Sequence, residues 1–375
     1  MTNNSNPPTP CIGRLAPSPT GAQHVGNART YLLAWLSVRL QGGQLRLRIE
    51  DIDSPRVKPW AIDETLEDLH WLGLDWDSME TDSGHGEGLS DAIVPAGVWL
   101  QTERVSIYEH YLQALLRAGR LYPCYCSRKD IEAAASAPHR EDQLLRYPDT
   151  CRDRIGPSEI FPHRQSGRPS DEKSFGQDAA SDRPFAWRFR SQDEVIEFDD
   201  LVCGLQSSRP HQDQGDFVIA KSNGHVAYQL AVVVDDHQMG VTEVVRGDDL
   251  IPSTFWQLEI YRAFGWTPPK FCHVPLVVGP DGRRVAKRHG DTRLSEIRRR
   301  GLGPEKLLGE LAFSCGWLEG PRPIAALELL DILARFASDG LANTRQNADW
   351  QKLPRHPYVL WESTWRAILD GTAGG

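Results

Sequence analysis

The chain has 375 residues, of which 40% are hydrophobic and 25% are charged. These values are those of an ordinary soluble globular protein, and the length allows two or three domains. The net charge of -9 argues against a nonspecific nucleic-acid binder, which would carry a basic excess. Residues 1–10 lack the pattern of a signal peptide and no stretch is apolar enough to cross a bilayer, so we expect a cytoplasmic protein with a disordered lead and no membrane contact.

The first part of the chain alternates between strand and helix patterns. A short apolar run over residues 11–16 predicts a strand, and a loop with two prolines and a glycine follows it. Apolar residues at helical spacing over 28–40 predict a helix that stops at Gly42 and Gly43. Alternation over 45–49 predicts a second strand, and 62–72 a second helix. This order is the opening of a doubly wound α/β domain.

Further along the chain, two segments poor in apolar residues, 79–97 and 152–182, are predicted to be insertions. A helical pattern over 102–118 separates them. The region 185–190 again has the composition of an ordered strand.

The next segment carries a turn signal, Ser222-Asn223-Gly224, between apolar runs at 217–220 and 226–234. This pattern predicts a β-hairpin, and Ala231 to Val234 predicts a buried strand that ends at Asp235 and Asp236. Another strand is expected over 241–245, followed by a helix from about Ser253. After Lys287 the apolar spacing predicts helices around 307–311 and 326–336.

The loop after the first predicted strand contains residues suited to phosphate binding. Backbone N–H groups at a helix N-terminus favour anions, His24 can donate to a phosphate oxygen, and Gly26 lets a nucleotide approach the backbone. His-x-Gly-Asn alone is a weak signal, since a histidine at a helix start is more often a cap. It is more specific within Arg-x-Ala-Pro-Ser-Pro-Thr-Gly-x-x-His-Val-Gly-Asn, which spans Arg14 to Asn27.

This stretch resembles the signature of the glutamyl-type class I aminoacyl-tRNA synthetases, with His24 to Asn27 at the position of their His-Ile-Gly-His motif. Residues 284–288 stand at their Lys-Met-Ser-Lys-Ser motif, where only Lys287 is identical. The resemblance implies a Rossmann-type catalytic domain that activates L-glutamate with ATP and Mg²⁺, with His24 and Lys287 as catalytic residues. The positions that it implies for ATP are Thr20, Gly21, His24, Gly26, Asn27 and Lys287.

Glutamate carries two carboxylates and one ammonium group, so a selective pocket needs two cations and an anion. Glu50 and Arg246 stand at predicted strand ends, where ligands bind in a doubly wound sheet. Each also has an ordinary structural explanation: an ion pair with an arginine for Glu50, an ion pair with Asp248 for Arg246, and a place in the core for Tyr228. The glutamate-binding positions that the resemblance implies are Arg14, Leu15, Ala16, Pro17, Ser18, Glu50, Tyr228 and Arg246.

Three of the seven cysteines, Cys124, Cys126 and Cys151, fall in one stretch, which in a reducing compartment indicates a metal site sooner than a disulfide. One structural zinc ion per chain would need a fourth ligand. His139 is one candidate. The resemblance favours Tyr147 instead, because Cys-x-Cys followed by Tyr-x-x-x-Cys is typical of one subfamily. Three reduced cysteines without a metal are the alternative.

That subfamily is a shortened paralogue group, which activates glutamate without tRNA and transfers it to queuosine in the anticodon of tRNA(Asp). The resemblance therefore implies queuosine-bearing tRNA(Asp) as the partner of a chain that we expect to be monomeric. An ordinary synthetase that charges the tRNA 3′ end and a catalytically silent RNA-binding protein are the alternatives. The arginines from Arg293 to Arg300 could face RNA, but such a run is as often a solvated helix end.

The division expected from these patterns places the zinc-bearing insertion between two halves of the catalytic domain and a short helical domain at the end. Its parts are a disordered lead 1–10, the first catalytic half 11–120, the insertion 121–215, the second half 216–280, and the Lys287 loop with the helical region 281–375.

Overall fold

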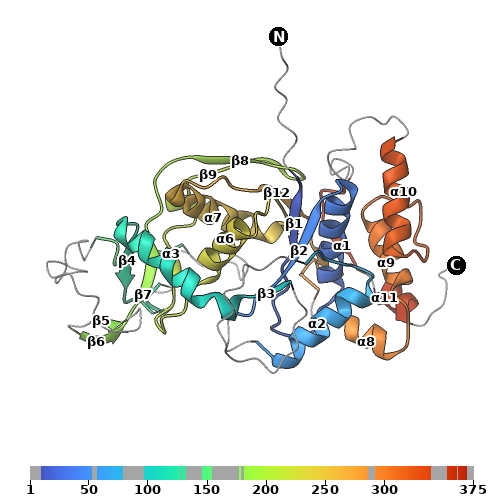
Figure 1. The fold of residues 1–375 in the computed structure, drawn as a ribbon, viewed down its shortest axis with the longest axis horizontal. Helices are drawn as coiled ribbons and strands as arrows, with labels where there is room; N and C mark the ends of the chain where they lie inside the picture. Colours follow the sequence, from blue (N-terminus) through green and yellow to red (C-terminus); the bar gives the residue numbers. More distant parts are fainter. Residues whose placement is uncertain are drawn as a thin grey trace, which may run out of the picture.

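A computed structural model gives the fold of the chain (Figure 1). It describes residues 10–52, 57–78, 97–127, 129–131, 146–153, 177–178, 181–285, 292–338, 353–360 and 362–369. Most of the two predicted insertions, Lys287 and His139 lie outside the described residues.

Parallel strands from two parts of the chain form the centre of the molecule. One group has the order β1–β2–β3 and the other pairs β11 with β12, all in parallel. The two groups meet where β1 borders β11, because the Thr242 N–H donates to the carbonyl of Ile12 at 2.8 Å. The sheet order confirms the predicted doubly wound α/β class. The strands are β1 (Ile12–Leu15), β2 (Gln44–Ile49), β3 (Val98–Leu100), β11 (Glu243–Gly247) and β12 (Lys270–Val274).

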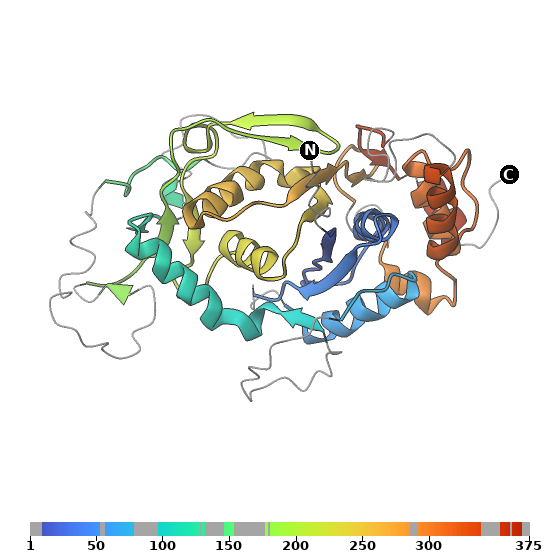
Figure 2. The same ribbon diagram turned by 45° about the horizontal axis from the view of Figure 1, so that its top comes forward.

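Helices cover both faces of these strands, with α1 and α6 on opposite sides (Figure 2). On one side α1 (Val25–Leu40) and α2 (Pro59–Trp71) pack into a large apolar core with the strands. On the other side α6 (Tyr228–Gln238), α7 (Ile251–Phe264) and α3 (Val105–Arg117) contribute to a second core cluster, and α7 also contributes to a third. The sheet is therefore buried on both faces, as a parallel sheet requires.

Smaller antiparallel units accompany these central strands, among them a separate three-stranded sheet and a hairpin at the sheet edge. β7 lies between β4 and β10, while the β8–β9 hairpin joins the outer edge of β12. The elements are η1 (Gln101–Arg104), β4 (Leu121–Cys124), β5 (Gln177–Asp178), β6 (Ser181–Pro184), β7 (Ala186–Phe189), β8 (Ile196–Asp200), β9 (Gly204–Ser208), α5 (Pro210–Asp213), β10 (Phe217–Ala220) and η2 (Asp248–Leu250).

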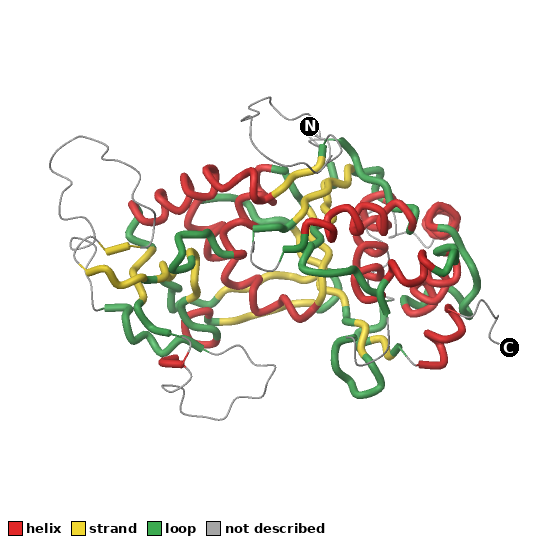
Figure 3. Tube along the Cα trace, turned by 90° about the horizontal axis from the view of Figure 1, so that it is seen from below, coloured by secondary structure: helices red, strands yellow, loops and turns green. Residues whose placement is uncertain are grey.

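The C-terminal part is mainly helical, as predicted, and its helices gather at one end of the molecule (Figure 3). A short parallel pair, β13 with β14, ties it to the residues that follow β12. Its elements are β13 (Val277–Val278), α8 (Leu294–Arg299), α9 (Glu305–Ser314), α10 (Ala326–Ser338), β14 (Tyr358–Val359) and α11 (Glu362–Leu369). None of the helices within the described ranges is long and apolar enough to cross a membrane.

The predicted strand over 226–234 is wrong, because Tyr228 to Gln238 form helix α6. The predicted turn is present, since Lys221 N–H donates to the carbonyl of His225 and Gly224 has a φ of 84°. Helix α6 is buried from Gln229 to Asp236. A helix that is buried all round shows no amphipathic period, so its run of valines resembles a buried strand.

Helix α9 packs against a neighbouring loop at Gly309, where there is no room for a side chain. A Cβ atom at Gly309 would lie 1.8 Å from the carbonyl oxygen of Arg322. We expect Gly309→Ala to destabilise the protein by about 1–3 kcal/mol, the usual cost of an overpacked core. At Gly320 no atom lies within 4 Å of the same added carbon, so Gly320→Ala is the matched control. Thermal unfolding should show a lower melting temperature for the first variant only, and equal melting of the two would contradict this packing.

Candidate active site

A cleft of about 460 Å³ opens where the carboxyl ends of β1 and β11 meet the start of α1. Every described residue predicted for glutamate or ATP lines this cleft except Pro17, and Lys287 lies outside the described residues. Pro17 is buried and its carbonyl accepts a hydrogen bond from the Glu50 N–H at 2.9 Å, so it fixes the backbone of a cleft residue. The structure thus brings together groups from four separate stretches of sequence.

Arg14 and Glu50 line the cleft, and the buried Arg48 and Asp236 behind them alternate with them in charge. The fully buried Arg48 donates to Asp236 Oδ1 at 2.7 Å and to Glu50 Oε1 at 3.1 Å. Arg14 Nε lies 3.5 Å from Asp236 Oδ1, and Arg14 Nη1 donates to the carbonyl of Val245 at 3.0 Å. Burial raises the pKa of Glu50, while Arg48 and Arg14 oppose that rise. The structural pairing considered for Glu50 is therefore present, although Glu50 still faces the cleft.

Arg246 is buried and, among the described residues, makes no ion pair with a carboxylate. Its Nη2 donates to Thr254 Oγ1 at 2.7 Å and to Gln257 Oε1 at 2.8 Å, and its Nη1 is buried without a hydrogen-bond partner. The pairing with Asp248 is not formed in the structure. Burial lowers the pKa of Arg246, but a guanidinium stays charged in proteins. The cleft therefore contains a buried cation with an unused N–H group, which suits an anionic ligand.

Two smaller polar groups complete this side of the cleft. Ser18 Oγ donates to Glu50 Oε2 at 3.4 Å. Tyr228 is the first residue of helix α6, whereas the prediction placed it within a strand. Burial raises the pKa of Tyr228 to about 12, so its hydroxyl stays protonated and can donate a hydrogen bond.

The other side of the cleft is built around the start of α1. His24 is the N-cap residue of this helix, and its backbone N–H donates to Asn27 Oδ1 at 3.3 Å. Burial lowers the pKa of His24 to about 4, and the charge of Arg284 adds to this effect. The imidazole is therefore neutral at physiological pH, and its buried Nδ1 has no hydrogen-bond partner. A Cβ at Gly26 would lie 3.3 Å from this ring, so the glycine makes room for the imidazole.

The second predicted motif begins at the mouth of the cleft. Arg284 lines it, and its Nη1 lies 3.1 Å from Asp249 Oδ2. The backbone reaches this point through a turn in which Gly282 has a φ of 71°. Asp249 was not among the predicted site residues, and neither were Arg48, Asp236, Thr254 and Gln257. The available signal is the pair Asp235 and Asp236 after an apolar run, but that run has the pattern of a buried strand and forms a helix.

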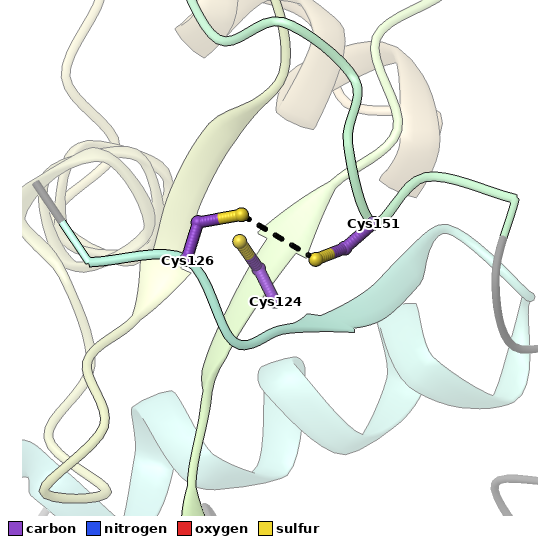
Figure 4. A group of neighbouring side chains, drawn as sticks. All are labelled: Cys124, Cys126 and Cys151. Carbon is purple, nitrogen blue, oxygen red and sulfur yellow. Dashed lines mark hydrogen bonds between the residues drawn. The ribbon is translucent and has the colours of Figure 1, made fainter. Parts of the chain in front are cut away.

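The three clustered cysteines meet in space, outside the cleft. Figure 4 shows the thiol of Cys124, at the end of β4, and that of Cys126, two residues later, gathered beside the thiol of Cys151, which lies on a separate loop. Their sulfur atoms all lie within 4.8 Å of one another, and Cys126 Sγ is 3.6 Å from Cys151 Sγ. The Tyr147 hydroxyl lies 3.4 Å from Cys124 Sγ and 3.8 Å from Cys126 Sγ. Around a tetrahedral zinc ion with bonds of about 2.3 Å, sulfur atoms stand about 3.8 Å apart, so this donor set fits zinc.

Comparison with known proteins agrees with this arrangement. Residues 11–321 match the model of the catalytic domain of class I tRNA synthetases (E and Q). The chain therefore belongs to the class I tRNA synthetase family of the E and Q type.

Among the relatives, a glutamyl-Q tRNA(Asp) synthetase of Rhodopirellula baltica is 46% identical over 93% of this chain and 96% of its own length. One from Symbiobacterium thermophilum is 42% identical over 96% of this chain and 99% of its own length. A glutamate–tRNA ligase of Syntrophus aciditrophicus is 36% identical and is covered over 64% of its length. The solved glutamate tRNA ligase of Elizabethkingia meningosepticum has the same fold, with a TM-score of 0.69 at 22% identity over 96% of this chain and 69% of that one.

Proposed function

We propose that this protein activates L-glutamate with ATP and transfers it to queuosine in the anticodon of tRNA(Asp). The observation that carries the first step is a cleft with one buried cation, Arg246, that no carboxylate neutralises among the described residues. The relatives named glutamyl-Q tRNA(Asp) synthetase, at 42–46% identity, support the second step.

In the activation step, an oxygen of the substrate α-carboxylate attacks the α-phosphorus of ATP. The bond from that phosphorus to the bridging oxygen breaks, and pyrophosphate leaves with the electron pair. The second carboxylate of glutamate does not react, so it can be held by a fixed cation, and we assign Arg246 to it. Glu50, which lines the same cleft, is the group of opposite charge for the substrate ammonium.

On the nucleotide side, His24, Asn27 and the first backbone N–H groups of α1 are proposed to hold the phosphates. The neutral imidazole of His24 can donate a hydrogen bond to a phosphate oxygen, which develops negative charge as pyrophosphate leaves. Mg²⁺ bound mainly by phosphates and water neutralises part of the triphosphate charge when it is present. Lys287, outside the described residues, is proposed for the same phosphates.

In the transfer step, a hydroxyl of the queuosine ring attacks the carbonyl carbon of the glutamyl adenylate, an ester bond forms, and AMP leaves. An ordinary synthetase would use a hydroxyl of the tRNA 3′-terminal ribose instead. The glutamate–tRNA ligase relative keeps this alternative open, at a lower identity of 36%. No observation favours a catalytically silent protein, because Arg14, Arg246 and Glu50, the two cations and the anion expected for glutamate, all line the cleft.

The activation step is tested by ATP–pyrophosphate exchange with glutamate and without tRNA. We expect exchange with L-glutamate that far exceeds exchange with glutamine or aspartate. If glutamate fails to stimulate exchange in a folded protein that binds ATP, the proposal of amino-acid activation is wrong.

We further propose that Cys124, Cys126, Cys151 and Tyr147 hold one structural zinc ion in the insertion 121–215 of the domain division given above. The fit rests on three sulfur atoms and a phenolic oxygen at distances compatible with one tetrahedral ion. Cys151 N–H also donates to the Tyr147 oxygen at 2.8 Å, which orients the phenol. Zinc would supply folding stability at this place and no step of the reaction.

A zinc site predicts a specific pattern of metal loss. Metal analysis of the purified chain should give one zinc per chain. Cys124→Ser should lose the metal and melt at a lower temperature, while glutamate-dependent exchange by the folded fraction stays close to that of the parent. Cys315→Ser, at a buried cysteine outside the cluster, is the control and should retain the zinc. A metal-free parent chain would exclude the site.

A further inference from the structure

Three buried side chains form a row across three neighbouring strands behind the cleft. Arg246 on β11 is the register partner of His273 on β12, and Asp200 ends β8, which pairs with β12. His273 and Asp200 are both inaccessible to solvent, with side-chain exposures of 0%. Neither residue lines the cleft, so the row leads from the cleft wall into the interior.

The hydrogen bonds of this row define the tautomer of the imidazole. Asp200 accepts from the backbone N–H groups of Val202 and Cys203 at 3.0 and 2.8 Å. Burial alone would raise its pKa, but the hydrogen bond from His273 and those from these two backbone groups lower it. His273 Nδ1 lies 2.6 Å from Asp200 Oδ2 and must therefore carry the proton. Its Nε2 is then an acceptor, and Arg246 Nε donates to it at 3.0 Å.

These contacts hold one edge of the Arg246 guanidinium without neutralising it. With Nε on His273 and Nη2 on Thr254 and Gln257, only Nη1 is left without a partner. A carboxylate in the place of His273 would pair directly with the guanidinium and compete with an anionic substrate. A neutral imidazole, itself fixed by Asp200, orients the cation and leaves its charge for the ligand.

We propose that His273 and Asp200 are positioning residues that fix Arg246 for the non-reacting carboxylate of the substrate. The inference rests on the proposed glutamate activation for the identity of that carboxylate. It predicts a selective effect on amino-acid binding, because neither residue touches the nucleotide side of the cleft.

Two substitutions at one position separate this role from a merely structural one. In His273→Gln the amide oxygen can reach the place of Nε2 and accept from Arg246, while the contact with Asp200 is lost. In His273→Asn the amide can still donate to Asp200, but it is too short to reach Arg246. We expect the glutamate KM of ATP–pyrophosphate exchange to rise about tenfold or more in His273→Asn and to be largely restored in His273→Gln, as for loss of one hydrogen bond to a charged group.

The KM for ATP and kcat should change less than about twofold in both variants. The lost contact weakens glutamate binding equally in the ground state and in the transition state, so it raises only the glutamate KM. Ser37→Ala, which removes a buried hydrogen bond to Glu243 outside the cleft, is the control for loss of buried polar contacts and should leave the glutamate KM unchanged. An equal rise in His273→Asn and His273→Gln, or a parallel rise in the KM for ATP, overturns the proposal. If the His273 variants do not fold, Asp200→Asn, of nearly the same shape, should raise the glutamate KM selectively, and an unchanged KM overturns the proposal.

A parent enzyme without glutamate-dependent exchange would refute the proposed function and leave this inference open to a structural test. Crystal structures should then show the Arg246 guanidinium in place in His273→Gln and turned away in His273→Asn. The same guanidinium position in both variants overturns the positioning role.

Discussion

Arg246→Ala should raise the glutamate KM of ATP–pyrophosphate exchange by about 100-fold or more. The substitution removes a buried guanidinium of the cleft that pairs with no carboxylate among the described residues and whose Nη1 has no hydrogen-bond partner there. Loss of charge-assisted hydrogen bonds to a buried carboxylate costs about 3 kcal/mol, which corresponds to about two powers of ten. The KM for ATP should stay within a few-fold of the parent value.

The matched control for this change is Arg262→Ala. Arg262 lies on the same helix that supplies Thr254 and Gln257, but its side chain is exposed and does not line the cleft. It should leave both KM values unchanged. If the glutamate KM of Arg246→Ala equals that of Arg262→Ala, the amino acid is held elsewhere.

His24→Ala should lower kcat for exchange by about 10²–10³, the usual effect of removing one hydrogen-bond donor that stabilises developing charge. His24 caps α1 at the nucleotide side of the cleft, and its ring packs over Gly26. The exposed His225, outside the cleft, gives the control substitution His225→Ala. The glutamate KM should change little, because Arg246 and Glu50 are untouched. A rise in the glutamate KM with an unchanged kcat would contradict the assignment of His24 to ATP.

The charge state of His24 leads to an expectation about pH. Burial and the charge of Arg284 lower its pKa to about 4, so the imidazole remains neutral from about pH 6 to pH 9. We therefore expect that the pH profiles of exchange activity of the parent and of an Asn27→Ala variant, which both keep His24, contain no step near pH 6.5 that is lost when His24 is substituted. Such a step would mean that His24 titrates with an ordinary pKa.

The first half of the sheet was predictable because its elements have clear periods. The strand at 12–15, the helix at 25–40 and the strand at 44–49 match the predicted segments to within three residues. Their order fixes where the carboxyl ends of the strands lie, so Arg14, Glu50 and His24 could be expected at one edge. The structure places these residues in the lining of one cleft, and their chemical roles remain proposals.

The second half was harder to predict, for physical reasons. Helix α6 is buried on every side, and its valines therefore lack a helical period. Strands β8 and β12 were not among the predicted elements, so Asp200 and His273 gave no local signal. Their meeting with Arg246 depends on pairing between strands that lie far apart in the chain. Local sequence patterns carry no information on such contacts.

The cysteine cluster lies between these two cases. Its spacing predicted a metal site, and the three thiols do converge. The choice between Tyr147 and His139 could not be made from spacing alone. The position of the Tyr147 hydroxyl, within 3.8 Å of two thiols, supports the tyrosine.

The most direct test of the account is to locate the glutamate after transfer. Queuosine-containing tRNA(Asp), the same tRNA without queuosine, and tRNA(Glu) are incubated with the protein, ATP and labelled glutamate, and the products are digested to nucleosides. We predict an alkali-labile label on the anticodon queuosine of tRNA(Asp) and no label on the other two RNAs. Label on the 3′-terminal adenosine of tRNA(Glu) or tRNA(Asp) would contradict the account and identify the protein as an ordinary glutamate-charging enzyme.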